Sequence, residues 1–399
     1  MTATADAVVI GGGVIGAACA EALSRLWPRV TLVERLGLAA GTSSACQSGV
    51  GHGVSGDAYD LGLDRAAIDA YRALVADGLD AGYERTGALL VCREAEAASV
   101  AARLPQLAAL GFDCAWLDPA ALQQAEPRLA PGFAGALRLS DMGQVSPMKL
   151  VHALARRAAG RGATIRTGTE VTAIELERGR VAAVATSGGR IATPRVVIAG
   201  GVWSRALAAL AGLSLPVWPL KGHVLVTEPL PGLLRHYVTE AEYEAGAASF
   251  AGPAPSDGPP AAAPPRVAAV LQPLPSGQLL IGSSREFAED REVSRARLAE
   301  IARRACRLVP LLARRRVIRS YAGLRPWTPD GRPLIGPTAE VEGLALATGH
   351  AGEGNTRALI TGRLVADLLA GMPPPLDPRP LSPDRFALRR DHSMGTMSR

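Results

Sequence analysis

Val8-Val9-Ile10-Gly11-Gly12-Gly13-Val14-Ile15-Gly16 is the stretch of sequence that decides the fold. An apolar run typical of a buried strand, expected at 5–10, leads into the glycine pattern GxGxxG, and a helix is expected at 14–27. In such a turn the first glycine permits the sharp bend, the second lets backbone amides approach a pyrophosphate, and the third lets the helix pack on the strand. The stretch therefore predicts a Rossmann-type βαβ unit that binds a dinucleotide at the N-terminus of its helix.

The residue that ends the second strand of this unit restricts which dinucleotide can bind. That strand is expected at 30–34 and ends in Glu34. A carboxylate at this place accepts hydrogen bonds from the ribose hydroxyls of an adenosine, and it repels a 2′-phosphate. NADP is therefore disfavoured, whereas this unit by itself does not separate FAD from NAD.

The composition is that of a large globular protein. The chain has 399 residues, 48% of them hydrophobic and 20% charged, which suffices for a large core and two structural units. The formal net charge is +6, and Lys149 and Lys221 are the only lysines. Arginine is scattered along the sequence, whereas a nucleic-acid-binding protein concentrates its positive charge. We therefore expect no nucleic-acid partner and a modest field that attracts anionic substrates.

The cysteines and the apolar runs indicate the compartment. The five cysteines are widely spaced and form no CxxC motif, which argues against a disulfide framework and against a metal site built by this chain alone. No stretch of the sequence is apolar over 18 or more residues, so no membrane-spanning helix is expected. We expect a cytoplasmic protein without a bound metal.

Two further stretches point to a known family. They are VIAGGVWS at 197–204 and AGLRPWTPDGRPLIG at 322–336. Together with the N-terminal unit, they resemble the D-amino acid oxidase, glycine oxidase and sarcosine oxidase family of flavoproteins over nearly the whole chain. The segment IGSSREF at 281–287 is most similar to the β subunits of multi-subunit dye-linked dehydrogenases. Those enzymes include proline or hydroxyproline dehydrogenase, opine oxidase and hydrogen cyanide synthase.

The resemblance implies a fold of the α/β plus α+β class, in which a mixed-sheet substrate domain is inserted into a Rossmann-type FAD-binding domain. Helices that alternate with buried strands at both ends of the chain, around a strand-rich middle, agree with this arrangement. We expect the FAD-binding domain at 1–82, 141–212 and 317–375. The substrate domain is expected at 83–140 and 213–316 with a flexible loop at 245–265, and a C-terminal tail at 376–399.

The resemblance also implies the residues that contact FAD. They come from the glycine-rich turn, the end of the second strand, the loop beside the isoalloxazine, the second approach to the phosphates, and the loop and helix near the flavin pyrimidine. The expected residues are Gly11, Gly13, Val14, Ile15, Gly16, Glu34, Arg35, Thr42, Ser43, Ser44, Cys46, Gln47, Ser48, Gly49, Val171, Ala199, Gly200, Trp203, Arg325, Gly349, Gly352, Gly354, Asn355 and Thr356.

Two residues are the candidates for catalysis. By resemblance Arg325 binds the substrate carboxylate, which a guanidinium can hold through two parallel hydrogen bonds; the alternative is an arginine in a structural ion pair. His350 lies in the loop near the flavin pyrimidine, and the alternative is an ordinary loop histidine. Cys46 and His52 are further candidates for groups near the flavin, with the same alternative of unremarkable loop residues.

The implied reaction is oxidation of a C–N bond in an amino acid or N-substituted amino acid, of the glycine, D-amino acid, hydroxyproline or opine type. Hydride passes from the α-carbon to flavin N5, and water hydrolyses the resulting imine. The strand 278–282 lacks the lysine that promotes reaction with oxygen in the sarcosine oxidase branch. This favours the β-like subunit of a multi-subunit dehydrogenase, whose partners could share an additional FMN or iron–sulfur cluster. The alternatives are a stand-alone oxidase that forms hydrogen peroxide and a non-catalytic flavin-binding subunit.

Overall fold

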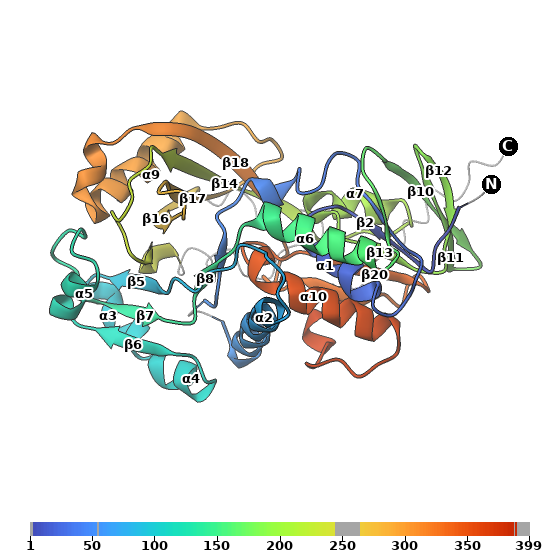
Figure 1. Ribbon diagram of the computed structural model, residues 1–399, viewed down its shortest axis with the longest axis horizontal. Helices are drawn as coiled ribbons and strands as arrows, with labels where there is room; N and C mark the ends of the chain where they lie inside the picture. The colour runs from blue at the N-terminus through green and yellow to red at the C-terminus, as the bar shows by residue number, and fades with distance from the viewer. Residues whose placement is uncertain (1–2, 54–55, 244–263, 387, 389–399) are drawn as a thin grey trace.

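A computed structural model describes residues 3–53, 56–243, 264–386 and 388. Most of the loop predicted at 245–265 lies outside the described residues, and so does most of the tail after residue 386. Figure 1 shows one lobe built on a largely parallel sheet and a second lobe built on a larger mixed sheet.

The six-stranded sheet contains the predicted βαβ unit. Its strands run in the order β19-β20-β13-β2-β3-β9, and all neighbours are parallel except β19 and β20. The central strands are short apolar segments buried on both faces, as expected where helices or a second sheet cover a parallel sheet. The strands are β2 (Ala7–Ile10), β3 (Val30–Val33), β9 (Thr164–Arg166), β13 (Val196–Ile198), β19 (Leu334–Pro337) and β20 (Leu344–Thr348).

Three helices and a small sheet cover this parallel sheet. Helices α1 (Val14–Leu23), α6 (Pro147–Gly160) and α10 (Gly354–Leu369) lie together, and α1 packs closely against α10. A second core joins the other face to a four-stranded sheet in the order β1-β12-β11-β10. Its strands are β1 (Ala3–Thr4), β10 (Val171–Glu177), β11 (Arg180–Thr186) and β12 (Gly189–Ala192).

The second lobe is an eight-stranded mixed sheet in the order β18-β14-β17-β16-β15-β5-β7-β6. Helix α9 (Arg295–Leu308) packs on one face of it through an apolar cluster. The strands are β5 (Ala88–Cys92), β6 (Cys114–Leu117), β7 (Gly135–Leu139), β14 (Trp218–Thr227), β15 (Tyr237–Glu240), β16 (Arg266–Pro273), β17 (Leu279–Phe287) and β18 (Val317–Trp327).

Five further α-helices and a small sheet lie within the described residues. The remaining helices are α2 (Ala58–Ala76), α3 (Glu94–Ala101), α4 (Leu104–Ala109), α5 (Pro119–Ala125) and α7 (Ser204–Ala209). A two-stranded sheet pairs β4 (Gly49–Val50) with β8 (Gly143–Gln144). The fold class predicted from the sequence is confirmed. The domain boundaries stay a prediction. The prediction starts a flavin-binding segment at residue 317, and strand β18, which begins there, pairs with β14 in the larger sheet.

Helix starts agree with the sequence signals, whereas one helix is interrupted. Asp118 and Ser146 cap α5 and α6 by accepting hydrogen bonds from the N–H groups of residues 121 and 149.

The sequence pattern predicts one helix over 94–110, and this prediction is wrong: the structure has two helices, α3 and α4. Pro105 lies in the first turn of α4. Its ring would clash with the carbonyl of residue 101 in a continuous helix, so the chain breaks before it.

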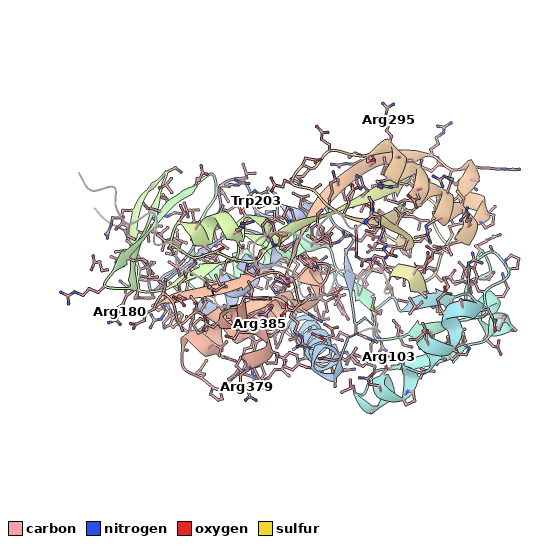
Figure 2. All side chains as sticks on the ribbon, turned by 180° about the vertical axis from the view of Figure 1, so that it is seen from behind. Arg103, Arg180, Trp203, Arg295, Arg379 and Arg385 are labelled. Carbon is pink, nitrogen blue, oxygen red and sulfur yellow. The ribbon has the colours of Figure 1, made fainter. Side chains whose placement is uncertain are left out.

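The positive charge is distributed over the surface. Figure 2 shows Arg180, Arg295 and Arg379 at separate places on the periphery, and all three are exposed. The expectation of scattered rather than concentrated arginine agrees with this view. Within the described part of the chain, no helix is both long enough and apolar enough to cross a membrane.

The contact between α1 and α10 yields a test of packing. A Cβ added at Gly362 of α10 would lie 2.4 Å from the backbone oxygen of Ala18 in α1, so Gly362→Ala forces the helices apart. We expect this substitution to lower the free energy of unfolding by about 1–3 kcal/mol. Gly62 in α2 is the matched control because a Cβ there meets nothing within 4 Å. Gly62→Ala should raise stability by about 0.5–1 kcal/mol. Urea unfolding measures both; equal effects at the two sites would contradict this account.

Candidate functional site

The glycine-rich turn between β2 and α1 is shaped by backbone contacts that exclude side chains. Gly11 has a φ of +118°, and a Cβ there would lie 2.4 Å from the backbone oxygen of Ala199 on the strand-end loop after β13. A Cβ at Gly16 would lie 1.9 Å from the oxygen of Gly11. Gly13 differs, because a Cβ there would meet only the Oγ of Ser43, at 3.2 Å. The first and third glycines therefore build the turn, and the second leaves its open side free.

The carboxylate of Glu34 is fixed at the end of β3 beside this turn. Its Oε2 accepts the N–H of Gly12 at 2.7 Å, and its Oε1 accepts the N–H of Leu36 at 2.8 Å. Glu34 still lines the cavity described next. The side chain is thus oriented by the backbone before any ligand binds.

A cavity of about 460 Å³ runs from the glycine-rich turn to the larger sheet. Most of the residues predicted to contact FAD line it, although they come from segments far apart in the sequence. The predicted residues found in the lining are Gly11, Gly13, Val14, Ile15, Glu34, Arg35, Thr42, Ser43, Cys46, Gln47, Gly49, Val171, Ala199, Gly200, Trp203, Arg325, His350, Gly352, Gly354, Asn355 and Thr356.

Four predicted residues do not line the cavity: Gly16, Ser44, Ser48 and Gly349. Gly16 packs against the turn. Ser44 donates its hydroxyl hydrogen to the oxygen of Gly41 at 3.1 Å, and Ser48 donates its N–H to Gln272 at 3.0 Å. Gly349 has a φ of +80°. Each of the four residues is next to, or one residue away from, a residue that lines the cavity.

The end of the cavity beyond Glu34 is closed by a cation and an aromatic ring. The guanidinium carbon of Arg35 lies 4.5 Å from the centre of the Trp203 ring, a cation–π arrangement. A Cβ at Gly41 would lie 3.3 Å from the same ring. Sequence reasoning missed Thr169 and Glu170, which also line this end; they follow a short strand and carry no motif.

Arg325 of β18 is the half-buried cation of the site. Its Nη2 donates to the Oγ of Ser283 at 2.6 Å, and its Nη1 donates to the backbone oxygen of Ser284 at 3.0 Å. The side chain crosses Gly222 of β14, where a Cβ would lie 2.4 Å from Nη1. Burial lowers the pKa of Arg325. Among the described residues it forms no salt bridge, so the structural ion pair left open by the sequence is not found there.

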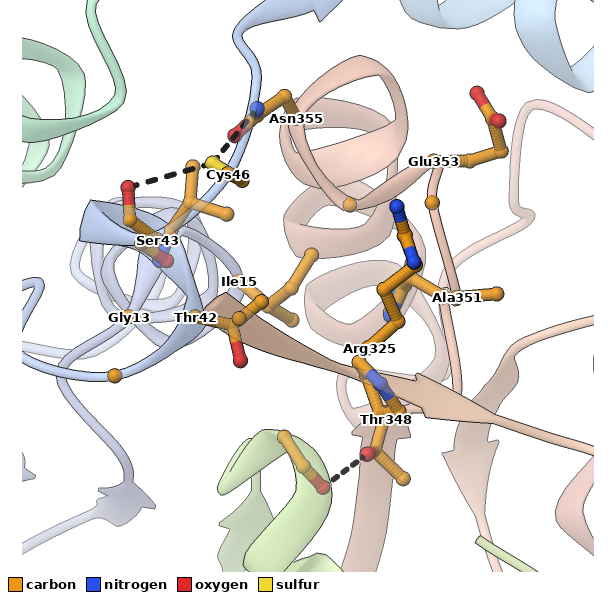
Figure 3. Close-up of a pocket in the computed structure, with 18 of the residues that line it drawn as sticks. Gly13, Ile15, Thr42, Ser43, Cys46, Arg325, Thr348, Ala351, Glu353 and Asn355 are labelled. Carbon is orange, nitrogen blue, oxygen red and sulfur yellow. Dashed lines mark hydrogen bonds between the residues drawn. The ribbon is translucent and has the colours of Figure 1, made fainter. Parts of the chain in front are cut away.

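Helix α10 begins at the cavity and is tied to the loop after the glycine-rich unit. Asn355 donates its side-chain N–H to the oxygen of Gln47 at 3.0 Å and lies 3.6 Å from the Sγ of Cys46. Gly51 donates its N–H to Thr356 at 3.1 Å. The first three residues of α10, Gly354, Asn355 and Thr356, line the cavity, so the positive end of the helix dipole lies at its wall. Figure 3 shows Arg325 reaching from β18 toward Glu353 and the start of α10.

His350 is buried beside the same loop. Its Nε2 lies 2.9 Å from the hydroxyl of Thr361. Its Nδ1 is buried and, within the described residues, has no hydrogen-bond partner. Burial, with a smaller contribution from Arg357, lowers the pKa of His350 to about 3, so the ring is neutral at ordinary pH. A neutral ring nitrogen without a partner at a cavity wall suits a polar ligand.

These features fit a flavin dinucleotide. The glycine-rich turn leaves open space at Gly13, and the carboxylate of Glu34 is fixed where an adenosine ribose would bind. At the other end of the cavity lie the unpartnered Nδ1 of His350 and the N-terminus of α10. The residues that surround the cavity therefore meet the requirements of the phosphates, the ribose and an electron-accepting ring.

Comparisons with known proteins agree with this geometry. The profile of the DAO family, described as FAD dependent oxidoreductase, matches residues 6–368. A glycine oxidase of Geobacillus kaustophilus is 34% identical, over 96% of this chain and 97% of that protein. The hydrogen cyanide synthase subunit HcnC of Pseudomonas aeruginosa is 31% identical, over 97% of both.

Solved structures show the same fold. The crystal structure of glycine oxidase from Geobacillus kaustophilus matches with a TM-score of 0.81 and 32% identity, over 96% of this chain and 98% of that one. The crystal structure of L-proline dehydrogenase from P. horikoshii has a TM-score of 0.85 at 23% identity, over 97% and 99%. The resemblance stated from the sequence is confirmed. The chain is an enzyme of the DAO family of FAD-dependent oxidoreductases, and its cofactor is FAD.

Proposed function

We propose that this enzyme oxidises the C–N bond of an amino acid or an N-substituted amino acid. The observation that carries the proposal is Arg325: its half-buried guanidinium lines the same cavity as the glycine-rich turn and makes no salt bridge within the described residues. Partial burial of a charge without a salt bridge carries a desolvation cost, and a carboxylate would offset it with two parallel hydrogen bonds. The substrate carboxylate is therefore assigned to Arg325.

FAD would be held along the cavity by the residues already described. The amides near Gly13 and Ala199 would hold its phosphates, and Glu34 would accept hydrogen bonds from its adenosine ribose. When bound, FAD accepts a hydride equivalent from the α-carbon of the amine. The N-terminus of α10 stabilises negative charge that develops beside it, and His350 offers its free Nδ1 to a hydrogen-bonding ligand group.

The protein contributes position more than acid–base chemistry. Arg325 fixes the carboxylate end of the substrate and thereby orients the α-carbon. The reaction then proceeds as an effectively unimolecular step within the bound complex. The amine is required in its neutral form, and the imine that results is hydrolysed by water. His350 stays neutral at working pH because burial lowers its pKa to about 3, and it therefore serves as a positioning group and not as a cation.

The proposed electron acceptor is a partner subunit, in the manner of a β-like subunit of a multi-subunit dehydrogenase. One relative that is 31% identical is named a hydrogen cyanide synthase subunit. The cavity lining contains no lysine: Lys221 lies elsewhere, with its Nζ 3.0 Å from Asp290, and Lys149 is on α6. Partner subunits would carry any additional FMN or iron–sulfur cluster.

A stand-alone oxidase that forms hydrogen peroxide is the second candidate. Glycine oxidases are among the relatives, at up to 34% identity over nearly the whole chain. The substrate assignment to Arg325 is the same in both cases. The two proposals differ only in where the electrons go.

The first prediction from the proposed function tests the cofactor assignment. Gly13→Ala places a methyl group on the open side of the turn without straining the backbone, so the protein should fold but lose FAD affinity at least tenfold. Gly37→Ala is the control, because a Cβ there meets nothing within 4 Å. The dissociation constant is measured by titrating apoprotein with FAD. Equal affinity in the two variants would contradict the placement of the phosphates.

The second prediction tests Arg325. Arg325→Lys loses one of two parallel hydrogen bonds and should reduce kcat/KM for the best amino acid about ten- to a hundredfold, mainly through KM. Arg319→Lys, an exposed position on the same strand, is the matched control and should be unchanged. Steady-state kinetics measure both. If turnover of the complete assembly is unaffected by Arg325→Lys, the non-catalytic flavin-binding role gains instead.

The third prediction separates the two acceptors. The chain purified alone, with FAD bound, should reduce an artificial dye with substrate present and form little hydrogen peroxide. Parallel assays of dye reduction and peroxide under air measure the ratio. Vigorous peroxide formation by the isolated chain would overturn the partner-subunit proposal and support the oxidase.

A further inference from the structure

The cavity continues beyond Arg325 across the larger sheet. Its floor there is a row of side chains on neighbouring strands, since Tyr237 of β15 is in register with Ala88 of β5, and Ala88 with Leu139 of β7. Leu90 follows on the same face of β5, opposite Thr239. All five side chains line the cavity. The floor is therefore mostly apolar, and its polar groups are the hydroxyls of Tyr237 and Thr239.

The opposite wall approaches this floor through glycines. A Cβ at Gly49 would lie 3.5 Å from the ring of Tyr237, and a Cβ at Gly51 would lie 1.5 Å from the Sδ of Met142. Met142 and His52 complete the wall; the Nε2 of His52 is buried and has no hydrogen-bond partner among the described residues. We call the space between Ala88, Leu90, Leu139, Met142 and Tyr237 the apolar chamber.

Charged side chains line the cavity elsewhere. Within the described lining, Glu34, Arg35 and Glu170 stand near the glycine-rich turn, and Arg325 and Glu353 lie between β18 and α10. A charged or strongly polar group in the apolar chamber would lose its hydration without a counter-ion. An apolar group would gain from burial there.

The apolar chamber lies too far from Arg325 to serve a very small substrate. The guanidinium lies over β17, where it bonds to Ser283 and Ser284. The wall of the apolar chamber nearest to β17 is Tyr237 on β15, and the sheet passes from β17 through β16 to β15. Two steps of about 4.8 Å make a separation of roughly 10 Å. Glycine, anchored by its carboxylate, reaches none of this space.

We infer that the substrate of this enzyme carries a bulky apolar group, on its α-carbon or on its amine nitrogen, which occupies the apolar chamber while the carboxylate binds Arg325. This inference rests on the proposed function and names its substrate class. Large aliphatic or aromatic amino acids, and glycine N-substituted with such groups, share the required chemistry. Glycine and sarcosine are poor substrates.

The test uses the holoenzyme and straight-chain carboxylates as probes. Acetate, butanoate, hexanoate and octanoate are titrated while the flavin absorption spectrum is recorded. Each buried methylene should tighten the dissociation constant about three- to fourfold until the apolar chamber is filled. Affinity that does not change with chain length would overturn the inference.

Variants locate the effect. Ala88→Leu fills the apolar chamber and should remove most of the gain of octanoate over acetate. Ala98→Leu, the same exchange on the exposed surface of α3, should not. Because Ala88→Leu could fail to fold, Leu139→Ala provides the reverse change and should extend the chain length at which affinity stops rising. Identical length profiles in Leu139→Ala and the unchanged protein would overturn the assignment.

Substrate kinetics distinguish the two attachment points. Higher kcat/KM for leucine or phenylalanine enantiomers places the apolar group on the α-carbon, and higher kcat/KM for N-benzylglycine places it on nitrogen. Either should exceed glycine at least tenfold; glycine as the best substrate would overturn the inference. If no carboxylate binds and Arg325→Lys changes nothing, the proposed function itself falls. If acetate binds through Arg325 and length has no effect, only the apolar chamber falls.

Discussion

The structure depends on backbone segments that approach more closely than any side chain would allow. The turn at Gly11 lies against Ala199, and a Cβ at Gly323 of β18 would be 2.0 Å from the oxygen of Ala45. The first contact joins the glycine-rich turn to the end of β13, and the second joins the loop after that turn to the larger sheet. Both contacts border the cavity, and the second sets how closely the two lobes approach each other at the site.

The electrostatics of the cavity follow from the treatment of buried charges. Arg357 is paired with Asp64, whose Oδ1 lies 2.7 Å from its Nε. Burial alone would lower the pKa of Arg357, but the charge and hydrogen bond of Asp64 raise it. Arg325 has hydrogen bonds to a hydroxyl and a carbonyl in place of a carboxylate, and burial lowers its pKa. The first pair is neutral and structural, whereas Arg325 makes no salt bridge within the described residues and can accept a carboxylate as its partner.

Local features of the fold were predictable from the sequence, and long-range features were not. The βαβ unit, the capped starts of α5 and α6 and the start of α10 at residue 354 follow from glycine, serine and proline signals. Strand β15 was missed because its four residues, YVTE, have no pattern that outweighs their neighbours. Its place depends on pairing with β5, nearly 150 residues earlier in the chain, and such pairings are set by tertiary packing.

The same division explains which part of the site sequence could reveal. Arg325 and Glu34 stand in local motifs, so their chemistry was visible before the fold. Leu90 and Leu139 belong to ordinary apolar strands, and nothing in either strand distinguishes a side chain that packs in a core from one that lines a cavity. That distinction arises only when Gly51 brings its loop over the sheet. Catalytic chemistry is thus encoded in motifs, whereas the shape available to the substrate is encoded in how unremarkable strands are paired.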